Sequence, residues 1–295
     1  MEFKQLEAYI SVVKNRSFSK AAEELFLTQP TISSSISSLE NELGVVLLDR
    51  GSKETRPTKE GRTFYGYAQN IINAREKALG SMRKTDDEID GVLEIRASSI
   101  PANYIVPELV TEFSKKYPMV RFNIQQMDTK KVWSEILDGF GEIGFTGAFE
   151  RNKLKYTPLL KDRQIVITPD NEKFRNIFEE KGKLKIEDLR GEKFVAREDG
   201  SATWQEFLKI IGDTQGAGII AKCNSLEQVI ALVKAGLGVS AVSGIALESL
   251  PEGVLAFELE ADTAEREFYM VTNRDMTLSA TAKKFAEFVE RYKFR

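Results

Sequence analysis

Histidine is absent from the 295 residues of this sequence. A Ser-His-Asp or Cys-His catalytic arrangement is therefore excluded, and so are most zinc sites, which combine histidine with clustered cysteines. The carboxylate pairs Glu23-Glu24 and Glu179-Glu180 lie in polar segments, where we expect them to be solvated. We accordingly expect no enzyme activity, no metal site and no cofactor.

Cysteine and long apolar runs are also scarce. The single cysteine, Cys223, cannot form an intrachain disulfide, which suits a reducing compartment. No apolar run is long enough to span a bilayer, and residues 1–6 contain no apolar signal core. These features predict a cytoplasmic protein without membrane association.

A basic surplus, which nucleic-acid-binding proteins usually have, is missing as well: the formal net charge is −3. Residues 44–62 have a modest local surplus, with five cations (Arg50, Lys53, Arg56, Lys59 and Arg62) against three carboxylates. A patch of this size would bind a polyanion well only when several copies act together. Nucleic-acid binding by this chain would therefore favour a dimer or a tetramer.

Residues 18–37 indicate two short helices separated by a tight break, the pattern of a helix-turn-helix. Ser17 and Ser19 are suitable N-caps for the first helix, and Pro30 suits the first turn of the second. The second helix buries a stripe at helical spacing formed by Ile32, Ile36, Leu39 and Leu43. Gly44 is placed to cap its end.

The opposite face of the second helix contains small hydroxyl side chains, which would let the backbone approach a flat partner such as a DNA major groove. A serine-rich solvated face of an ordinary three-helix unit is the alternative. Residues 45–58 then suggest a hairpin wing with cations at its tip. The candidate DNA contacts are Gln29, Thr31, Ser33, Ser34 and Ser38 in the helix, and Arg50, Lys53 and Arg56 in the wing.

A long helix is predicted from Thr58 to about Lys84. Its apolar positions Phe64, Ala68, Ile71, Ala78 and Met82 have nearly heptad spacing. We predict that this seam packs against a second copy of the chain.

These N-terminal residues resemble the LysR-type transcriptional regulators, and the likeness extends over the whole chain. The matching motifs are Ala21-Ala22, Thr28–Ser33, Ile36–Gly44, Leu47–Arg50 and Pro57–Gly61. The resemblance implies a sequence-specific DNA-binding regulator that binds promoter DNA as a dimer or tetramer, with RNA polymerase as a further partner.

One departure from the family pattern concerns DNA reading. Many members carry Arg, Gln or His where this chain has Ser34 and Ser35. Serine discriminates weakly between bases, so we expect specificity to depend more on the wing and on DNA shape.

Beyond an acidic break at residues 85–91, strands and helices alternate, which predicts a mostly parallel sheet covered on both faces. The first group comprises strands at 92–97, 120–124 and 143–146 and helices at 107–117 and 132–137. The second comprises strands at 193–196, 219–221 and 239–242 and helices at 204–211 and 226–235. A strand at 268–272 and a helix at 279–292 are expected to return to the first body.

The family resemblance implies a type II periplasmic-binding-protein-like effector domain with two lobes and a cleft. The predicted domains are a winged helix-turn-helix at 1–58, a linker and dimerisation helix at 59–87, and an effector-binding domain at 91–295. Lobe I takes residues 91–161 and 269–295, and lobe II takes 162–268.

Hydroxyl residues follow strands and begin helices at three places, where open α/β sheets bind ligands. Helix N-termini stabilise anions, so we expect a small anionic effector, although N-capping alone is the alternative use of such residues. The candidates are Ser98, Ser99, Thr129, Ser201 and Thr203, with Arg197 as a cation, and Phe145 and Thr146 as weaker matches to the family. Residues 98–118 also resemble family members concerned with sulfur, selenium or inorganic-carbon assimilation.

The sequence therefore predicts a cytoplasmic, effector-responsive, DNA-binding regulator. The competing interpretation is a solute-binding protein with an N-terminal protein-interaction module and no DNA role.

Overall fold

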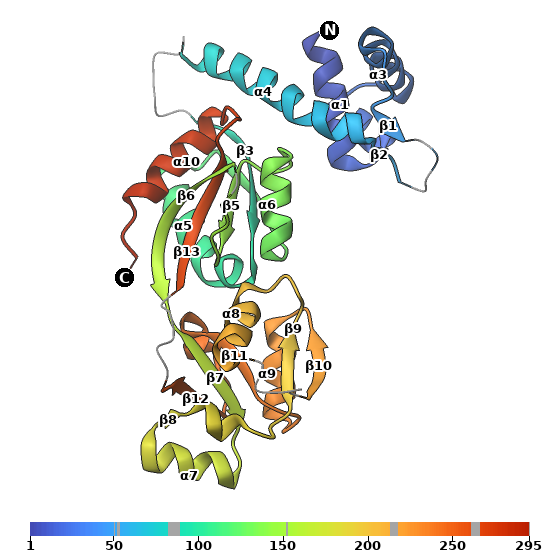
Figure 1. Ribbon diagram of the computed structural model, residues 1–295. Helices are drawn as coiled ribbons and strands as arrows, with labels where there is room; N and C mark the ends of the chain where they lie inside the picture. Colours follow the sequence, from blue (N-terminus) through green and yellow to red (C-terminus); the bar gives the residue numbers. More distant parts are fainter. Residues whose placement is uncertain are drawn as a thin grey trace.

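The computed structural model describes residues 1–49, 51, 54–81, 89–151, 153–212, 218–260 and 266–294. They form a small N-terminal helical unit, a long helix and two α/β lobes arranged end to end (Figure 1). This is the predicted fold class. Within the described residues, no helix is both long and apolar enough to cross a membrane.

The N-terminal unit contains three helices and a small hairpin. The helices are α1 (Phe3–Asn15), α2 (Phe18–Glu24) and α3 (Gln29–Leu43), and strand β1 (Leu48–Asp49) pairs antiparallel with β2 (Arg56–Pro57). Tyr9, Ile32, Ile36 and Leu39 are fully buried in their shared core. The predicted helix-turn-helix and wing are both present.

Local caps explain where α2 and α3 begin and end. Ser17 Oγ accepts a hydrogen bond from the Lys20 amide at 3.3 Å, and Thr28 Oγ1 accepts one from the Thr31 amide at 3.4 Å. Each hydroxyl thus satisfies an amide that the helix leaves unpaired. Gly44 ends α3 at φ 67°, a left-handed conformation that glycine adopts without steric cost.

Helix α4 (Lys59–Ser81) packs against the N-terminal unit of its own chain. Ala68 is fully buried there, Ile71 is partly buried, and the Phe64 ring lies 5.5 Å from the Tyr9 ring. Within the chain, α4 thus covers an apolar face left by α1 to α3, and packing of the remaining seam positions against a second copy stays a prediction. Ala78 is exposed, and Met82 lies outside the described residues.

Lobe I is a five-stranded mixed sheet with strand order β4-β3-β5-β13-β6. Its strands are β3 (Gly91–Ala97), β4 (Val120–Gln126), β5 (Ile143–Thr146), β6 (Leu154–Asp162) and β13 (Arg266–Asn273). β3 runs parallel to β4 and β5, whereas β13 runs antiparallel to β5 and β6. The prediction of a mostly parallel sheet was wrong here, because β13 returns from the other lobe against the strand direction.

Helices cover both faces of this sheet. A π-helix, η1 (Pro101–Ile105), leads into α5 (Val106–Lys116), which packs with α10 (Ala280–Arg291) on one face. Helix α6 (Thr129–Leu137) lies on the other face, where Val132 and Ile136 contact Val271 of β13.

Lobe II has a four-stranded sheet of order β11-β7-β12-β8 and a parallel pair β10-β9. The strands are β7 (Gln164–Pro169), β8 (Lys183–Leu184), β9 (Phe194–Arg197), β10 (Ile219–Cys223), β11 (Ser240–Ser243) and β12 (Val254–Leu259). A bridge between Phe194 and Val239 joins the two groups. The helices are α7 (Glu172–Lys181), η2 (Ile186–Leu189), α8 (Ala202–Ile211), α9 (Leu226–Lys234) and η3 (Gly244–Ser249).

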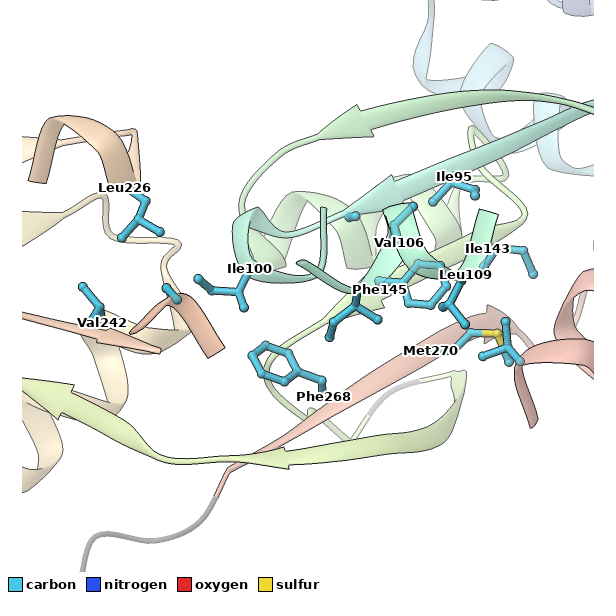
Figure 2. Close-up of a cluster of buried hydrophobic side chains, with 14 of the residues drawn as sticks. Ile95, Ile100, Val106, Leu109, Ile143, Phe145, Leu226, Val242, Phe268 and Met270 are labelled. Atoms are coloured by element: carbon cyan, nitrogen blue, oxygen red, sulfur yellow. The ribbon is translucent and has the colours of Figure 1, made fainter. Parts of the chain in front are cut away.

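The lobes are joined where β6 passes into β7 and where the chain returns to β13. Asp162 and Arg266 are paired positions of β6 and β13, so Arg266–Phe268 belong to the lobe I sheet although the sequence assigned them to lobe II. One apolar cluster includes residues of both lobes; Figure 2 shows Ile100 of lobe I opposite Leu226 and Val242 of lobe II.

Helix α4 also lies against lobe I, near the end that carries α10 (Figure 1). The Tyr65 ring stacks on Phe140 with 4.5 Å between ring centroids. Asn73 Nδ2 donates to Glu142 Oε1 at 3.2 Å and to the Thr277 carbonyl at 2.9 Å. The N-terminal unit is therefore connected to lobe I by specific contacts as well as by the chain.

Candidate functional site

The outer surface of α3 displays small polar side chains without charge. Gln29, Thr31, Ser34 and Ser38 are exposed, and Ser33 is half-buried. Ser38 Oγ accepts a hydrogen bond from Gln5 Nε2 at 3.2 Å, which leaves its own hydroxyl hydrogen available. A surface with this shape and chemistry can approach base edges closely.

Charge on this side of the molecule comes from the wing. Arg56 is exposed and lies 3.7 Å from Glu54, which also contacts Arg16 at 3.4 Å. Arg50 and Lys53, the other two predicted wing contacts, lie outside the described residues.

A groove of about 760 Å³ separates the C-terminal half of α3 from the wing. Arg56 and Arg62 line it together with Ser37, Asn41 and Thr58. Arg62 was counted in the local charge but was not predicted as a contact, because its position on α4 gave no sign that it would face the same groove.

The second candidate site is a small pocket between the lobes. Six predicted effector residues line it: Ser98, Ser99, Thr129, Arg197, Ser201 and Thr203. Its volume is about 20 Å³, which is room for roughly one water-sized group. The structure thus brings together side chains that are more than a hundred residues apart, and whether they bind an effector stays a prediction.

Capping accounts for part of this cluster. Ser201 Oγ accepts from the Trp204 amide at 3.5 Å and caps α8, while Asp128 caps α6 by accepting from the Lys131 amide at 3.0 Å. Ser201 still has a hydroxyl hydrogen to donate into the pocket. The capping interpretation and the ligand interpretation are therefore compatible.

Arg197, at the end of β9, is 4% exposed and crosses from lobe II to lobe I. Its Nε and Nη2 donate to the two carboxylate oxygens of Glu198 at 2.9 and 2.8 Å. Nη2 also donates to Ser99 Oγ at 3.0 Å and to the Asn224 carbonyl at 3.4 Å. This guanidinium links the lobes directly.

A second buried arginine, Arg266, lines the same pocket and was missed from the sequence. Its Nε donates to Asp162 Oδ2 at 2.6 Å, and its Nη1 donates to Thr203 Oγ1 at 2.6 Å. Burial lowers the pKa of the Arg266 guanidinium, and the charge and hydrogen bond of Asp162 oppose that shift. Each of the two connections between the lobes has a charged residue at its lobe I end, Asp162 in one and Arg266 in the other. Two isolated charges form no recognisable sequence motif, so no stronger signal was available from the sequence.

Two predicted residues do not reach the pocket. Phe145 is fully buried in the apolar cluster shown in Figure 2, and its ring contacts the ring of Phe285 at 6.5 Å between centroids. Thr146 is fully buried and donates to the Ala148 carbonyl at 3.1 Å. Both side chains are used inside lobe I in this structure, and their role as effector contacts stays a prediction.

Comparison with known proteins matches both parts of the chain to one protein family. Residues 3–62 match the model described as "Bacterial regulatory helix-turn-helix protein, lysR family", and residues 86–293 match "LysR substrate binding domain". An uncharacterized HTH-type transcriptional regulator of Methanocaldococcus jannaschii is 31% identical over 289 residues, covering 96% of each chain. A probable RuBisCO transcriptional regulator of Cyanidioschyzon merolae is 28% identical over 293 residues, covering 96% of this chain and 95% of that protein.

Solved structures agree on the fold. Full-length OxyR from Pseudomonas aeruginosa superposes with a TM-score of 0.80 at 20% identity, covering 98% of this chain and 96% of that chain. The chain belongs to the LysR family of DNA-binding transcriptional regulators, with an N-terminal helix-turn-helix and a C-terminal substrate-binding domain.

Proposed function

We propose that this regulator reads promoter DNA with the surface of α3 and the wing, and that a small anion bound between the two lobes controls it. Its place of action would be the cytoplasm, as an oligomer, without catalysis of its own. The alternative, a solute-binding protein whose N-terminal unit binds another protein, conflicts with the match of residues 3–62 to a bacterial regulatory helix-turn-helix.

The DNA part of the proposal is supported by complementary surfaces. The exposed face of α3 has no charged side chain from Gln29 to Ser38, so its backbone can lie deep in a groove without repulsion. Arg56 and Arg62 line the groove beside the C-terminal half of α3, together with the carboxylates of Glu40 and Asp49, and suit phosphates at that end of the face. We therefore assign α3 to base contacts and these arginines to phosphate contacts.

The observation that carries the effector part is the pairing of two buried guanidinium groups with a ring of hydroxyl donors in one pocket. Arg197 and Arg266 are 4% and 8% exposed, and Ser98, Thr129 and Ser201 are buried beside them. These groups are donors, which favours an acceptor-rich ligand such as a carboxylate or an oxyanion. Three carboxylates, Asp128, Glu198 and Asp162, outnumber the two guanidinium groups, so the ligand must be small enough to reach the donors while it stays away from these carboxylates.

Coupling between the two sites would pass through lobe I and α4. Asn73 and Tyr65 of α4 contact lobe I directly, and α4 is packed on the core that holds α3. A change in lobe arrangement that moves Glu142 or Phe140 would therefore move α4. An effector that favours one arrangement would change the spacing or the bend of bound DNA.

A mobility-shift titration tests the whole proposal. The full chain is incubated with DNA from upstream of its own gene and with a scrambled fragment, each with and without bicarbonate, sulfate or phosphate. The likeness to a probable RuBisCO regulator makes the first of these anions a sensible probe. We expect specific retention that at least one anion alters, whereas equal retention of both fragments would favour the alternative.

A further inference from the structure

Asp162 and Arg266 occupy matching positions at the two places where the chain crosses between the lobes. Asp162 ends β6 and Arg266 begins β13, and the two are paired across the sheet. Their side chains are 1% and 7% exposed. A buried ion pair at a hinge resists separation of the strands, because removing either partner leaves an uncompensated charge.

The Asp162 carboxylate is bound from both lobes. Oδ2 accepts from Arg266 Nε at 2.6 Å and from Ser243 Oγ at 2.8 Å, and Ser243 ends β11 of lobe II. Oδ1 accepts from the Ile245 amide at 3.4 Å. The carboxylate therefore fixes lobe II to the crossing strands.

The Arg266 guanidinium extends from this hinge into the pocket. Nη1 donates to Thr203 Oγ1 on α8 of lobe II, and the guanidinium lies 5.0 Å from the centre of the Phe268 ring. Nη2 lies 2.5 Å from Asp162 Oδ2 but has no aligned hydrogen-bond partner, although it is buried. A buried donor with unused capacity is costly, and a ligand acceptor would relieve that cost.

Arg197 differs in this respect. Its Nε and Nη2 already have Glu198, Ser99 and the Asn224 carbonyl as acceptors. An anion would have to compete with a bidentate carboxylate there, whereas Arg266 Nη2, although 2.5 Å from Asp162 Oδ2, forms no aligned hydrogen bond that an anion would have to displace.

We propose that Arg266 couples occupancy of the pocket to the arrangement of the lobes. The inference rests on the proposed function and names the residue through which it works. Bicarbonate, sulfate and phosphate are larger than the water-sized space of this pocket. Such an anion can therefore accept from Arg266 of lobe I and from Ser201 or Thr203 of lobe II only in a slightly more open lobe arrangement that still holds these groups together. Such a ligand binds that arrangement more tightly than others and so increases its population. The Asp162–Arg266 pair then holds β7 and β13 in the positions of that arrangement.

The test combines titration calorimetry with hydrogen exchange on the full chain, using bicarbonate, sulfate and phosphate as probes. The double variant Asp162→Asn/Arg266→Gln removes both charges and so avoids a lone buried ion. We expect it to bind the preferred anion at least about tenfold more weakly, since a charge-assisted bond is worth about 1.5 to 3 kcal/mol. Anion should slow exchange in β7 and β13 of the wild type but not of the variant.

Two further variants make the test specific. Thr203→Val removes the hydroxyl that Arg266 contacts while leaving both charges in place, and we expect the same loss of exchange protection. Arg163→Gln is the matched control, because Arg163 adjoins Asp162 at the hinge but its side chain is 64% exposed. It should bind the anion and show protection as the wild type does.

The outcomes separate this inference from the proposed function. Wild-type affinity and protection in the double variant would overturn the role of Arg266 and leave anion control intact. If the double variant binds the anion more weakly but still shows exchange protection at saturating anion, the coupling role of Arg266 is also overturned. Arg266 would then contribute to anion affinity without linking it to the arrangement of the lobes. Failure of the wild type to bind any of the three anions would overturn both.

Discussion

Two regions of this chain present serine and threonine hydroxyls at the start of helices, yet they suit different partners. On α3, Thr31 and Ser34 are exposed, and no charged side chain stands beside them on that face. Between the lobes, Ser98 and Ser201 are buried beside arginines. Exposure and neighbouring charge, rather than the hydroxyls themselves, therefore distinguish the proposed DNA-binding surface from the proposed effector pocket.

The two regions also differ in the source of their binding energy. DNA affinity has to come from cations around α3, so it should fall steeply with salt. Anion affinity has to come from buried donors, which salt screens much less. The experiments below test this division from the largest expected effect to the smallest.

Ser34→Glu should have the largest effect, because it places a negative charge on the face of α3 assigned to the major groove. We expect DNA affinity to fall by about a hundredfold or more through repulsion of phosphates and loss of close approach. Fluorescence anisotropy with labelled upstream DNA measures it. Thr111→Glu, on the exposed surface of α5, is the charge-matched control. Equal affinities of the two variants would show that α3 does not face DNA.

Ser99→Ala tests the other region. The hydroxyl of Ser99 contacts Arg197 across the lobes and lies in the pocket, so its loss should cost anion affinity about 1 to 2 kcal/mol, or roughly tenfold. Titration calorimetry measures this change, and DNA affinity without anion should stay constant. Ser114→Ala, which changes a lobe I serine outside the pocket, is the control. An unchanged anion affinity would remove Ser99 from the site.

Arg56→Ala sharpens the electrostatic part of the comparison. Loss of one phosphate contact per subunit should weaken binding to all DNA sequences alike. The slope of log association constant against log salt concentration should become shallower by about one for each subunit. Anisotropy titrations at several salt concentrations give the slope. A change confined to one DNA sequence would instead make Arg56 a base-reading residue.

Glu142 links α4 to lobe I, and its substitution should have the smallest effect. Burial raises the pKa of its carboxyl, while bonds from the Ser279 amide and hydroxyl lower it. The pKa of Glu142 is higher in the folded state than in the unfolded state, so the folded state binds the proton more tightly. Its contribution to the free energy of unfolding is therefore present at low pH and is lost as pH rises through the folded pKa. Glu142→Gln should flatten that pH dependence, as measured by urea unfolding between pH 4.5 and 7. A parallel pH profile for both proteins would contradict the assignment.

The sequence was most informative where structure is local. The caps Ser17 and Gly44, the turn before Pro30 and the buried stripe beginning at Ile32 all depend on residues within a few positions of one another. Helix and turn rules operate at that range, so the helix-turn-helix and its family could be identified directly. The hydroxyl residues at the starts of α6 and α8 were found by the same rules.

Tertiary structure decided what depends on distant partners. The spacing of the apolar positions on α4 did not reveal that Ala68 is buried against α1 to α3 of the same chain. Phe145 lies near the end of a strand, and only the fold shows that its ring is buried against Phe285 of α10. Asp162 and Arg266 stand 104 positions apart, and only the antiparallel return of β13 makes them a buried pair beside the pocket. Amino-acid order by itself determined the DNA-reading motif and the family, whereas which charges meet between the lobes was decided by strand register, because ion pairing depends on distance in space and not on distance along the chain.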